Sequence, residues 1–168
     1  MPRPILILHN IRSVYNVGAI LRTAECFGVE KVIFSGYTPH LEKGLPHERE
    51  KISQALRKTA LGAEKLVPST YSPDIFTTIK ELKSTGYAII ALEQSPDSVA
   101  LGNYQPPEKL ALILGEEVHG IPPDLLTLAD TILEIPQRGQ KESLNVSIAA
   151  SIAIWEMTKI NNRFDISG

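Results

Sequence analysis

Short apolar runs that alternate with helical patterns limit the folds open to this chain more than any other feature. Strands are predicted at residues 4–8, 31–34, 87–92, 110–114 and 131–135. Helices are predicted at residues 17–27, 51–61, 73–85, 122–128 and 143–160. Strands that alternate with helices favour an α/β fold, in which helices cover both faces of a mostly parallel sheet.

The chain is expected to form one domain. Its 168 residues contain no repeat, low-complexity tract or linker, which favours a single unit over residues 1–168. The one cysteine, Cys26, excludes a disulfide framework and a cysteine zinc site, and it favours the cytoplasm. No apolar run approaches the ~18 residues of a membrane span, and residues 1–12 do not form a signal peptide. We therefore expect a cytoplasmic protein with no membrane partner.

The charge distribution bears on nucleic acid as a partner. A net charge of −2 argues against strong, non-specific binding of nucleic acid. Glu48, Glu50 and Glu64 stand among the basic side chains of one short stretch, so a solvated helix face with paired charges is an equally good interpretation. The basic side chains of that stretch are Arg49, Lys51, Arg57, Lys58 and Lys65. The sequence leaves both interpretations open.

Three predicted loops hold most of the unusual polar side chains. In parallel sheets, ligands bind beyond the carboxyl ends of the strands. That rule selects residues 9–16, 115–120 and 136–142, each of which follows a predicted strand. We therefore expect the functional site where these three loops meet.

The first loop leads into the first predicted helix. Asn16 stands where a helix N-cap is expected, and capping alone could explain its presence. Arg22 follows on the helix, with the small residues Gly18 and Cys26 four positions away on either side. That spacing leaves the guanidinium room near the helix N-terminus, and an ion pair with Glu25 is the simpler alternative.

The second loop combines glycine with acidic side chains. A predicted strand ends at Gly115, where a glycine allows a ligand to approach the backbone closely. Glu116 and Glu117 follow, and they could form a metal or acid–base site or a plain solvated turn. His119 is interpreted as a loop residue, because no second histidine lies at a spacing that suits a metal. The absence of G-x-G-x-x-G argues against a nucleotide-binding oxidoreductase.

The third loop precedes the last predicted helix, for which Ser143 is the expected N-cap. Asn145 falls in the first turn, where asparagine is a poor helix former, so its amide is expected to contact a ligand. The helix is then apolar on nearly every side, from Ile148 to Trp155. Because such a helix must be covered on every side, we predict a homodimer with this helix in the interface.

Together the three loops resemble the sequence motifs of the SpoU/TrmH family of SPOUT RNA methyltransferases, in the same order and over nearly the whole chain. The second motif is matched by Gly115, Glu117 and Gly120, and the third by residues 135–136 and 143–147. Residues 58–64 resemble a lesser feature of the family. The first motif is matched by Asn10, Arg12, Asn16, Gly18 and Arg22.

The resemblance implies a fold, a reaction and a cofactor. It implies that the C-terminal part of the α/β sheet is tied in a trefoil knot. It also implies methylation of a ribose 2′-hydroxyl in tRNA or rRNA, with S-adenosylmethionine as cofactor, S-adenosylhomocysteine as product and no metal. Two alternatives remain: a catalytically silent RNA-binding module of the same fold, and a base methyltransferase of the same superfamily.

The resemblance also assigns site residues. Arg22 would orient the ribose and stabilise its developing charge, because an arginine is almost always protonated. The residues that would hold Arg22, cofactor and ribose in line are Asn16, Glu117, Ser143 and Asn145. The residues that would line the cofactor pocket are Leu92, Gly115, Ile135, Ser143 and Leu144.

RNA recognition is expected on the surface of the methyltransferase domain itself. The first predicted strand begins near residue 1, so we expect no separate RNA-binding domain before it. Ser13 and Gln137 depart from residues that are common in the family, which affects the subgroup more than the reaction. The predicted RNA contacts are Arg12, Arg49, Lys51, Arg57, Lys58 and Arg138.

Overall fold

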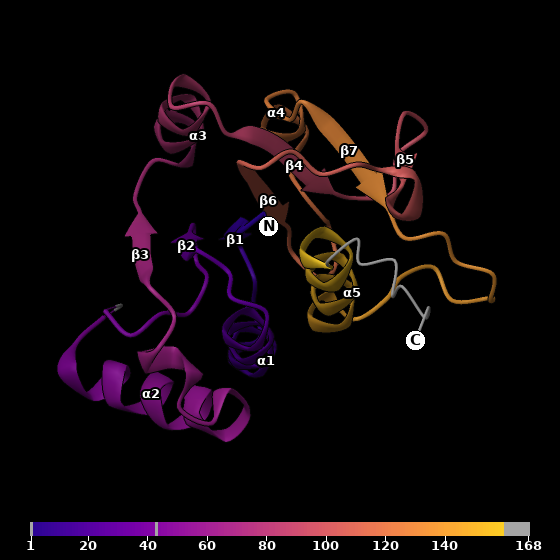
Figure 1. The fold of residues 1–168 in the computed structure, drawn as a ribbon. Helices are drawn as coiled ribbons and strands as arrows, with labels where there is room; N and C mark the ends of the chain where they lie inside the picture. Colours follow the sequence, from indigo (N-terminus) through magenta and orange to yellow (C-terminus); the bar gives the residue numbers. More distant parts are fainter. Residues whose placement is uncertain (1, 43, 160–168) are drawn as a thin grey trace, which may run out of the picture.

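One seven-stranded sheet organises the computed structural model, which describes residues 2–42 and 44–159 (Figure 1). Every strand pairing is parallel, and the strand order is β3-β2-β1-β6-β4-β7-β5. The strands are β1 (Ile5–His9), β2 (Lys31–Ser35), β3 (Ser69–Ser72), β4 (Ala88–Leu92), β5 (Val99–Ala100), β6 (Leu110–Leu114) and β7 (Thr131–Glu134). The central strand β6 is buried along its whole length, as expected for a strand covered on both faces.

Helices cover both faces of the sheet, which confirms the predicted α/β architecture (Figure 1). Leu6 and Leu8 of β1 join a core with α1 (Val14–Cys26), α2 (Pro46–Ala60) and α5 (Val146–Thr158). Ile5 and Ile7 point the other way, into a core with α3 (Ile75–Ser84) and α4 (Pro123–Leu126). This alternation follows from the two-residue repeat of a strand. Two short 3₁₀ helices, η1 (Ala63–Lys65) and η2 (Leu101–Asn103), complete the described elements.

Two edge strands escaped prediction because they carry little apolar signal. β3 is Ser-Thr-Tyr-Ser and is exposed except at Ser72, and β5 has only two residues. Helix α2 begins at Pro46, earlier than its apolar repeat indicated. Its first turn is polar and is stabilised by Glu48, whose carboxylate accepts a hydrogen bond from the backbone N–H of Leu45.

Both N-cap predictions were wrong by a few residues. Ser13 caps α1, and its Oγ accepts a hydrogen bond from the backbone N–H of Asn16 at 3.3 Å. Asn145 caps α5, and its Oδ1 accepts from the N–H of Ser147 at 2.9 Å. Ser143 therefore lies before α5, and Asn16 lies inside α1 with its side chain free for another contact. The predicted end of the last helix, Ile160, lies outside the described residues.

Helix α5 has one buried face and one exposed apolar face. Ala150, Ala153, Ile154 and Met157 are buried against the sheet and α1. The opposite face exposes apolar side chains at Ile148, Ile152 and Trp155. The helix is thus apolar all round, as predicted, but only its exposed face is available to a partner. None of the helices in the described ranges is long and apolar enough to span a membrane.

Gly18 lets α1 and α2 pack closely. A Cβ at position 18 would lie 2.1 Å from Thr59 Oγ1 and 2.9 Å from the carbonyl oxygen of Leu56. The Thr59 hydroxyl donates a hydrogen bond to the carbonyl of Tyr15 at 3.0 Å, so it cannot move away without losing that bond. Gly18 therefore makes room for α2. The sequence analysis had instead expected it to leave room for the guanidinium of Arg22.

Gly18→Ala should lower the free energy of unfolding by about 1–3 kcal/mol, because the added methyl group forces α1 and α2 apart. Urea denaturation would measure the change. Gly102→Ala is the control, since a Cβ at position 102 meets no atom within 4 Å and the change should stay within about 0.5 kcal/mol. Equal stability of the two variants would contradict the close approach at Gly18.

Candidate active site

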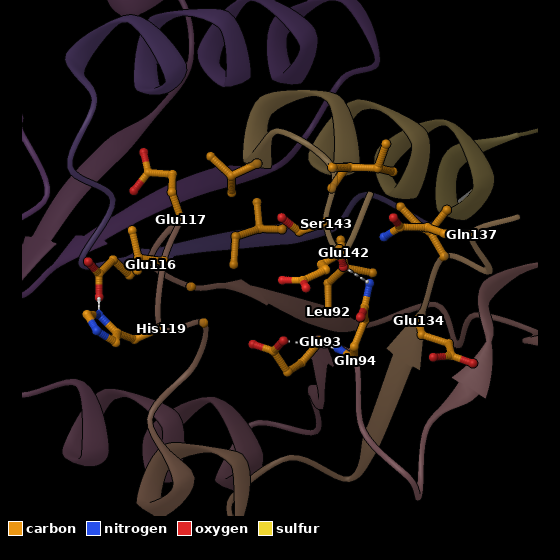
Figure 2. A pocket seen from close by; sticks show the side chains of 18 residues that line it. Leu92, Glu93, Gln94, Glu116, Glu117, His119, Glu134, Gln137, Glu142 and Ser143 are labelled. Atoms are coloured by element: carbon orange, nitrogen blue, oxygen red, sulfur yellow. Dashed lines mark hydrogen bonds and ion pairs between the residues drawn. The ribbon is translucent and has the colours of Figure 1, made fainter. Parts of the chain in front are cut away.

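A pocket of about 330 Å³ lies at the carboxyl ends of β4, β6 and β7, and residues of the second and third predicted loops line it (Figure 2). Its lining residues come from the ends of these strands, from residues 115–120 and from the segment that enters α5. All five residues assigned to cofactor binding line this one pocket: Leu92, Gly115, Ile135, Ser143 and Leu144. The volume is in the range of small-molecule sites, and Leu92, Ile135 and Leu144 provide apolar walls.

The loop 115–120 is held in a tight turn beside the pocket. Glu116 and Gly120 exchange two backbone hydrogen bonds, at 3.1 and 3.0 Å. A Cβ at Gly115 would lie 2.5 Å from the carbonyl carbon of Gly120, so only glycine fits there. Glu93, which the sequence analysis did not single out, accepts a hydrogen bond from the N–H of Ile121 at 2.8 Å. Glu93 directly follows the buried strand β4, and this position in the sequence could have identified it as a residue of the site.

The pocket wall is strongly acidic. Five carboxylates line it: Glu93, Glu116, Glu117, Glu134 and Glu142. Among the described residues that line the pocket, none is lysine or arginine. Such a wall favours a ligand with positive charge and disfavours a pyrophosphate, which argues further against a dinucleotide site.

Glu117 joins the first two loops by hydrogen bonds and is linked through Asn16 to the start of α5. Its carboxylate accepts from the backbone N–H groups of Arg12 and Ser13, at 3.0 and 3.2 Å, and from Asn16 Nδ2 at 3.0 Å. Asn16 Oδ1 in turn accepts from Asn145 Nδ2 at 3.2 Å. We call Glu117, Asn16 and Asn145 the relay. It links the ends of β1 and β6 to the start of α5.

The hydrogen bonds that Glu117 accepts keep its carboxylate ionised. Burial alone would raise the pKa of the Glu117 carboxyl, but the bonds from Arg12, Asn16 and Ser13 outweigh burial and lower the pKa below 4.5. Glu117 is therefore ionised at neutral pH and is a weak proton acceptor. Its role in the site is to hold the loop 10–13 and the Asn16 side chain in place.

Glu116 also binds the first loop, through the side chain of Arg12. Its carboxylate lies 2.7 Å from Arg12 Nε and 2.7 Å from His119 Nδ1, and Figure 2 shows the contact with His119. The adjacent carboxylates Glu116 and Glu117 are therefore neither a free solvated turn nor a metal site in this arrangement. Within residues 2–42 and 44–159, no three His, Cys, Asp or Glu side chains are placed to hold a metal ion.

A half-buried histidine fixes the start of the first loop. Asn10 Nδ2 donates to His9 Nε2 at 3.1 Å, so the proton of the ring lies on Nδ1, which donates to Ser35 Oγ at 2.8 Å. Burial lowers the pKa of His9 below 6.5, although Asp124 opposes the shift. Asn10 has a positive φ of 58°, and its Oδ1 accepts from the N–H of Tyr37. The sequence analysis missed the part played by His9.

Arg22 lies outside the pocket lining and the relay. It is on the exposed side of α1, and it forms no ion pair with Glu25 or with any other carboxylate of the described residues. Ser143, in contrast, lines the pocket (Figure 2). The structure thus brings together four of the five residues assigned to catalysis, and it leaves Arg22 facing solvent.

The predicted RNA contacts are exposed and widely spread. Arg138 lies in the segment between β7 and α5, and Arg12 is paired with Glu116. The other four are on α2: Arg49, Lys51, Arg57 and Lys58. Arg49 Nε donates to the carbonyl of Gly44, and Arg57 lies 4.0 Å from Glu64. Two of the four basic side chains therefore have a partner within the chain. Only Arg57 is paired with a carboxylate, as the paired-charge interpretation predicted.

Comparison with known proteins identifies relatives over most of the chain. The SpoU rRNA Methylase family model matches residues 3–155. The mouse tRNA (guanosine(18)-2'-O)-methyltransferase TARBP1 is 30% identical over 159 residues, which are 94% of this chain and 9% of that protein. The 23S rRNA (guanosine-2'-O-)-methyltransferase RlmB of Nitrosomonas europaea is 31% identical over 169 residues, 99% of this chain and 60% of that protein. The chain thus spans three fifths or less of the length of these two relatives.

Solved structures share the fold. An AdoMet-bound rRNA methyltransferase from Sinorhizobium meliloti superposes with a TM-score of 0.78 and 25% identity, over 92% of this chain and 55% of that one. The A. aeolicus TrmH/SpoU tRNA modifying enzyme gives a TM-score of 0.78 with 24% identity, over 93% of this chain and 74% of that one. The seven-stranded sheet is therefore that of the SpoU/TrmH structures.

Glu117→Gln should lower stability at pH 7 by about 1–2 kcal/mol, because a neutral amide loses the charge-assisted bonds of the relay. The folded pKa of Glu117 is below the unfolded value of 4.5, so its stabilisation is complete above that value and is lost as the pH falls through the folded pKa. The stability curves of wild type and variant should therefore converge in acid.

Denaturant unfolding from pH 7 to pH 3 would measure this convergence. Glu142→Gln is the matched control, because Glu142 also lines the pocket and its side chain is exposed. A gap between wild type and Glu117→Gln that stays constant down to pH 3 would show that the carboxylate charge is not what stabilises the relay.

Proposed function

The chain belongs to the SpoU rRNA methylase family, and we propose that it transfers a methyl group from S-adenosylmethionine to a ribose 2′-hydroxyl of tRNA or rRNA. One observation carries the proposal: the relay of Glu117, Asn16 and Asn145 joins the three family motifs beside a pocket of suitable chemistry. The names of the relatives, which describe guanosine 2′-O-methyltransferases of tRNA and rRNA, support it. An RNA substrate and a lone free cysteine also agree with a cytoplasmic location.

The pocket residues fit S-adenosylmethionine. Leu92, Ile135 and Leu144 offer apolar surface for an adenine, and Gly115 allows the backbone of Gly120 to pack closely at the edge of the pocket. The acidic wall suits the positive charges of the sulfonium and amino groups. When bound, this cofactor supplies a methyl group that is already activated for nucleophilic attack. The neighbouring S. meliloti structure is described as AdoMet-bound, which supports the same assignment.

The residues around the pocket would place the ribose. A ribose hydroxyl is a poor nucleophile, so its developing negative charge must be stabilised or its proton removed. Glu117 is a poor candidate for the base because its pKa is lowered. No residue of the relay is therefore assigned to remove the proton. Asn16, Asn145 and Ser143 orient the hydroxyl. Arg22 stabilises the charge on the RNA. Holding the reacting groups in line supplies several kcal/mol of the barrier.

The test is transfer from methyl-labelled S-adenosylmethionine to tRNA and rRNA from a strain that lacks the gene, followed by mass spectrometry of the nucleosides. A 2′-O-methylated nucleoside is expected. A methylated base would establish the base methyltransferase instead, and cofactor binding without transfer would favour the silent RNA-binding module. Each outcome thus selects one of the three functions.

Arg22→Ala should reduce kcat by about 100-fold or more, because the loss of a charge-stabilising group costs that much in comparable sites. Its affinity for S-adenosylmethionine, measured by calorimetry, should be unchanged, since Arg22 does not line the pocket. Arg3→Ala is the control, an exposed arginine whose Nε donates to the carbonyl of Gly28. Full turnover of Arg22→Ala would refute the role of Arg22.

We also propose that the chain forms a homodimer through α5. Ile148, Ile152 and Trp155 form one exposed apolar row, with 52%, 39% and 56% of their surface accessible. Phe27 at the end of α1 extends the row, since its ring meets that of Trp155 edge-to-face at 5.6 Å. A continuous apolar surface of this kind marks an interface. Arg22 faces solvent on α1, the helix that ends next to Phe27. In a dimer built on this row, Arg22 would therefore be accessible to the partner chain and to RNA bound by the partner chain.

Ile152→Glu should convert the dimer to a monomer, because it places a charge in the middle of the apolar row. Light scattering coupled to size exclusion would measure the mass. Leu66→Glu is the matched control, since Leu66 is 68% exposed and lies on another part of the surface, after η1. A dimeric Ile152→Glu variant would refute the interface on α5.

The trefoil knot that the family resemblance implies is also proposed for this chain. One contact of the described residues supports it. Gln94 Nε2, after β4, donates to the carbonyl of Glu142, so the segment that follows β7 lies beside the end of β4.

A further inference from the structure

We propose that a second cleft, between the first turn of α1 and the side of α2 that carries Lys51, Ile52 and Ala55, receives an unpaired base of the RNA next to the methylated nucleotide. The cleft measures about 310 Å³ and is separate from the cofactor pocket. This inference rests on the proposed function, because it takes RNA as the substrate.

The chemistry of the cleft matches a nucleotide. Val14, Pro39, Ile52 and Ala55 give it apolar walls, and Lys51 is the one charged residue that lines it. Apolar side chains pack against the faces of an unstacked base, and an ammonium group binds the phosphate attached to it. Bases in a duplex remain stacked and paired, so the cleft would select a single-stranded segment.

The charges of α2 favour RNA as the occupant over an apolar peptide. Lys51 and Lys58 are seven residues apart, about two helical turns, and therefore lie on the same side of the helix. Neither forms an ion pair with a carboxylate in residues 2–42 or 44–159. Arg49 and Arg57, which point in other directions, are occupied by Gly44 and Glu64. Three cations of α2 thus pair with no carboxylate in the described residues: Arg49, which is bound to a backbone carbonyl, and the two lysines Lys51 and Lys58, which lie on the side of the cleft.

The cleft and the relay share the first turn of α1. Val14 lines the cleft, whereas Asn16, two residues on, reaches Glu117 and Asn145 on the other side of the same turn. Arg12, just before this turn, is exposed and is held by Glu116. An RNA strand whose ribose is held at the relay therefore has a short path along Arg12 to Val14 and Lys51. The structure connects the site of methylation with the basic face of α2 by this route.

Binding of a single-stranded probe tests the cleft without any methyl transfer. The probe is a 12-nucleotide oligouridylate that carries 4-thiouridine, and the wild-type protein is cross-linked to it by near-ultraviolet light. Mass spectrometry should place cross-links on peptides that contain Val14 or residues 51–55. Cross-links confined to other peptides would overturn the proposal.

Two neutralising variants make the test quantitative. Lys51→Gln should raise the Kd for the probe about fivefold at 0.1 M salt and should reduce the slope of log Kd against log salt by about 0.7, the effect of one lost phosphate contact on a single strand. Arg49→Gln, the same charge change on the same helix, should leave both quantities nearly unchanged. Equal effects of the two variants would show that α2 attracts RNA only through its general charge and would overturn the cleft.

A third measurement separates failure of the cleft from failure of the proposed function. Lys51→Gln should raise the KM for an RNA substrate while kcat and the KM for S-adenosylmethionine stay unchanged. If the protein proves to transfer no methyl group, the binding and cross-linking results still decide the cleft. If transfer occurs and Lys51→Gln leaves the KM for RNA and the Kd for the probe at their wild-type values, the cleft is refuted and the methyltransferase is not.

Discussion

The carboxylate of Glu117 is the contact on which the arrangement of this site depends. It binds two backbone N–H groups of the first loop and the side chain of Asn16, which in turn reaches Asn145 at the start of α5. Segments more than a hundred residues apart are thereby held together by a single ionised group. Because the hydrogen bonds outweigh burial, Glu117 keeps its charge at neutral pH. The group therefore organises the site and is not suited to accept a proton.

Charge is segregated on this chain in a way that its net value conceals. A net charge of −2 hides an acidic pocket wall at the ends of β4, β6 and β7 and a basic helix α2 at the other side of α1. Negative potential in the pocket favours a cationic cofactor, and the cations of α2 favour a polyanion. The chain thus presents two separate surfaces that suit ligands of opposite charge, the acidic pocket and the basic helix α2.

The sequence could predict the buried strands and the loops of the site because both depend on local patterns. Apolar runs marked β1, β2, β4, β6 and β7, and the rule on carboxyl ends then selected three loops. The second and third line the pocket, and the first is hydrogen-bonded to Glu117 beside it. The polar edge strand β3 and the early start of α2 carry no such pattern, and they were missed. The caps were misplaced by a few residues because Ser13, Asn16, Ser143 and Asn145 are all good capping types, and only contacts distinguish them.

The sequence by itself determined the fold class, the family motifs and the group of residues at the pocket, since periodicity and residue type are local properties. Tertiary structure alone decided which groups touch. It assigned Gly18 to helix packing, placed Arg22 in solvent, and showed that α5 turns Ile152 outward and Ala153 inward. It also distinguished Lys51 from Arg49, which the sequence could not, because the direction of a side chain depends on how its helix lies against its neighbours.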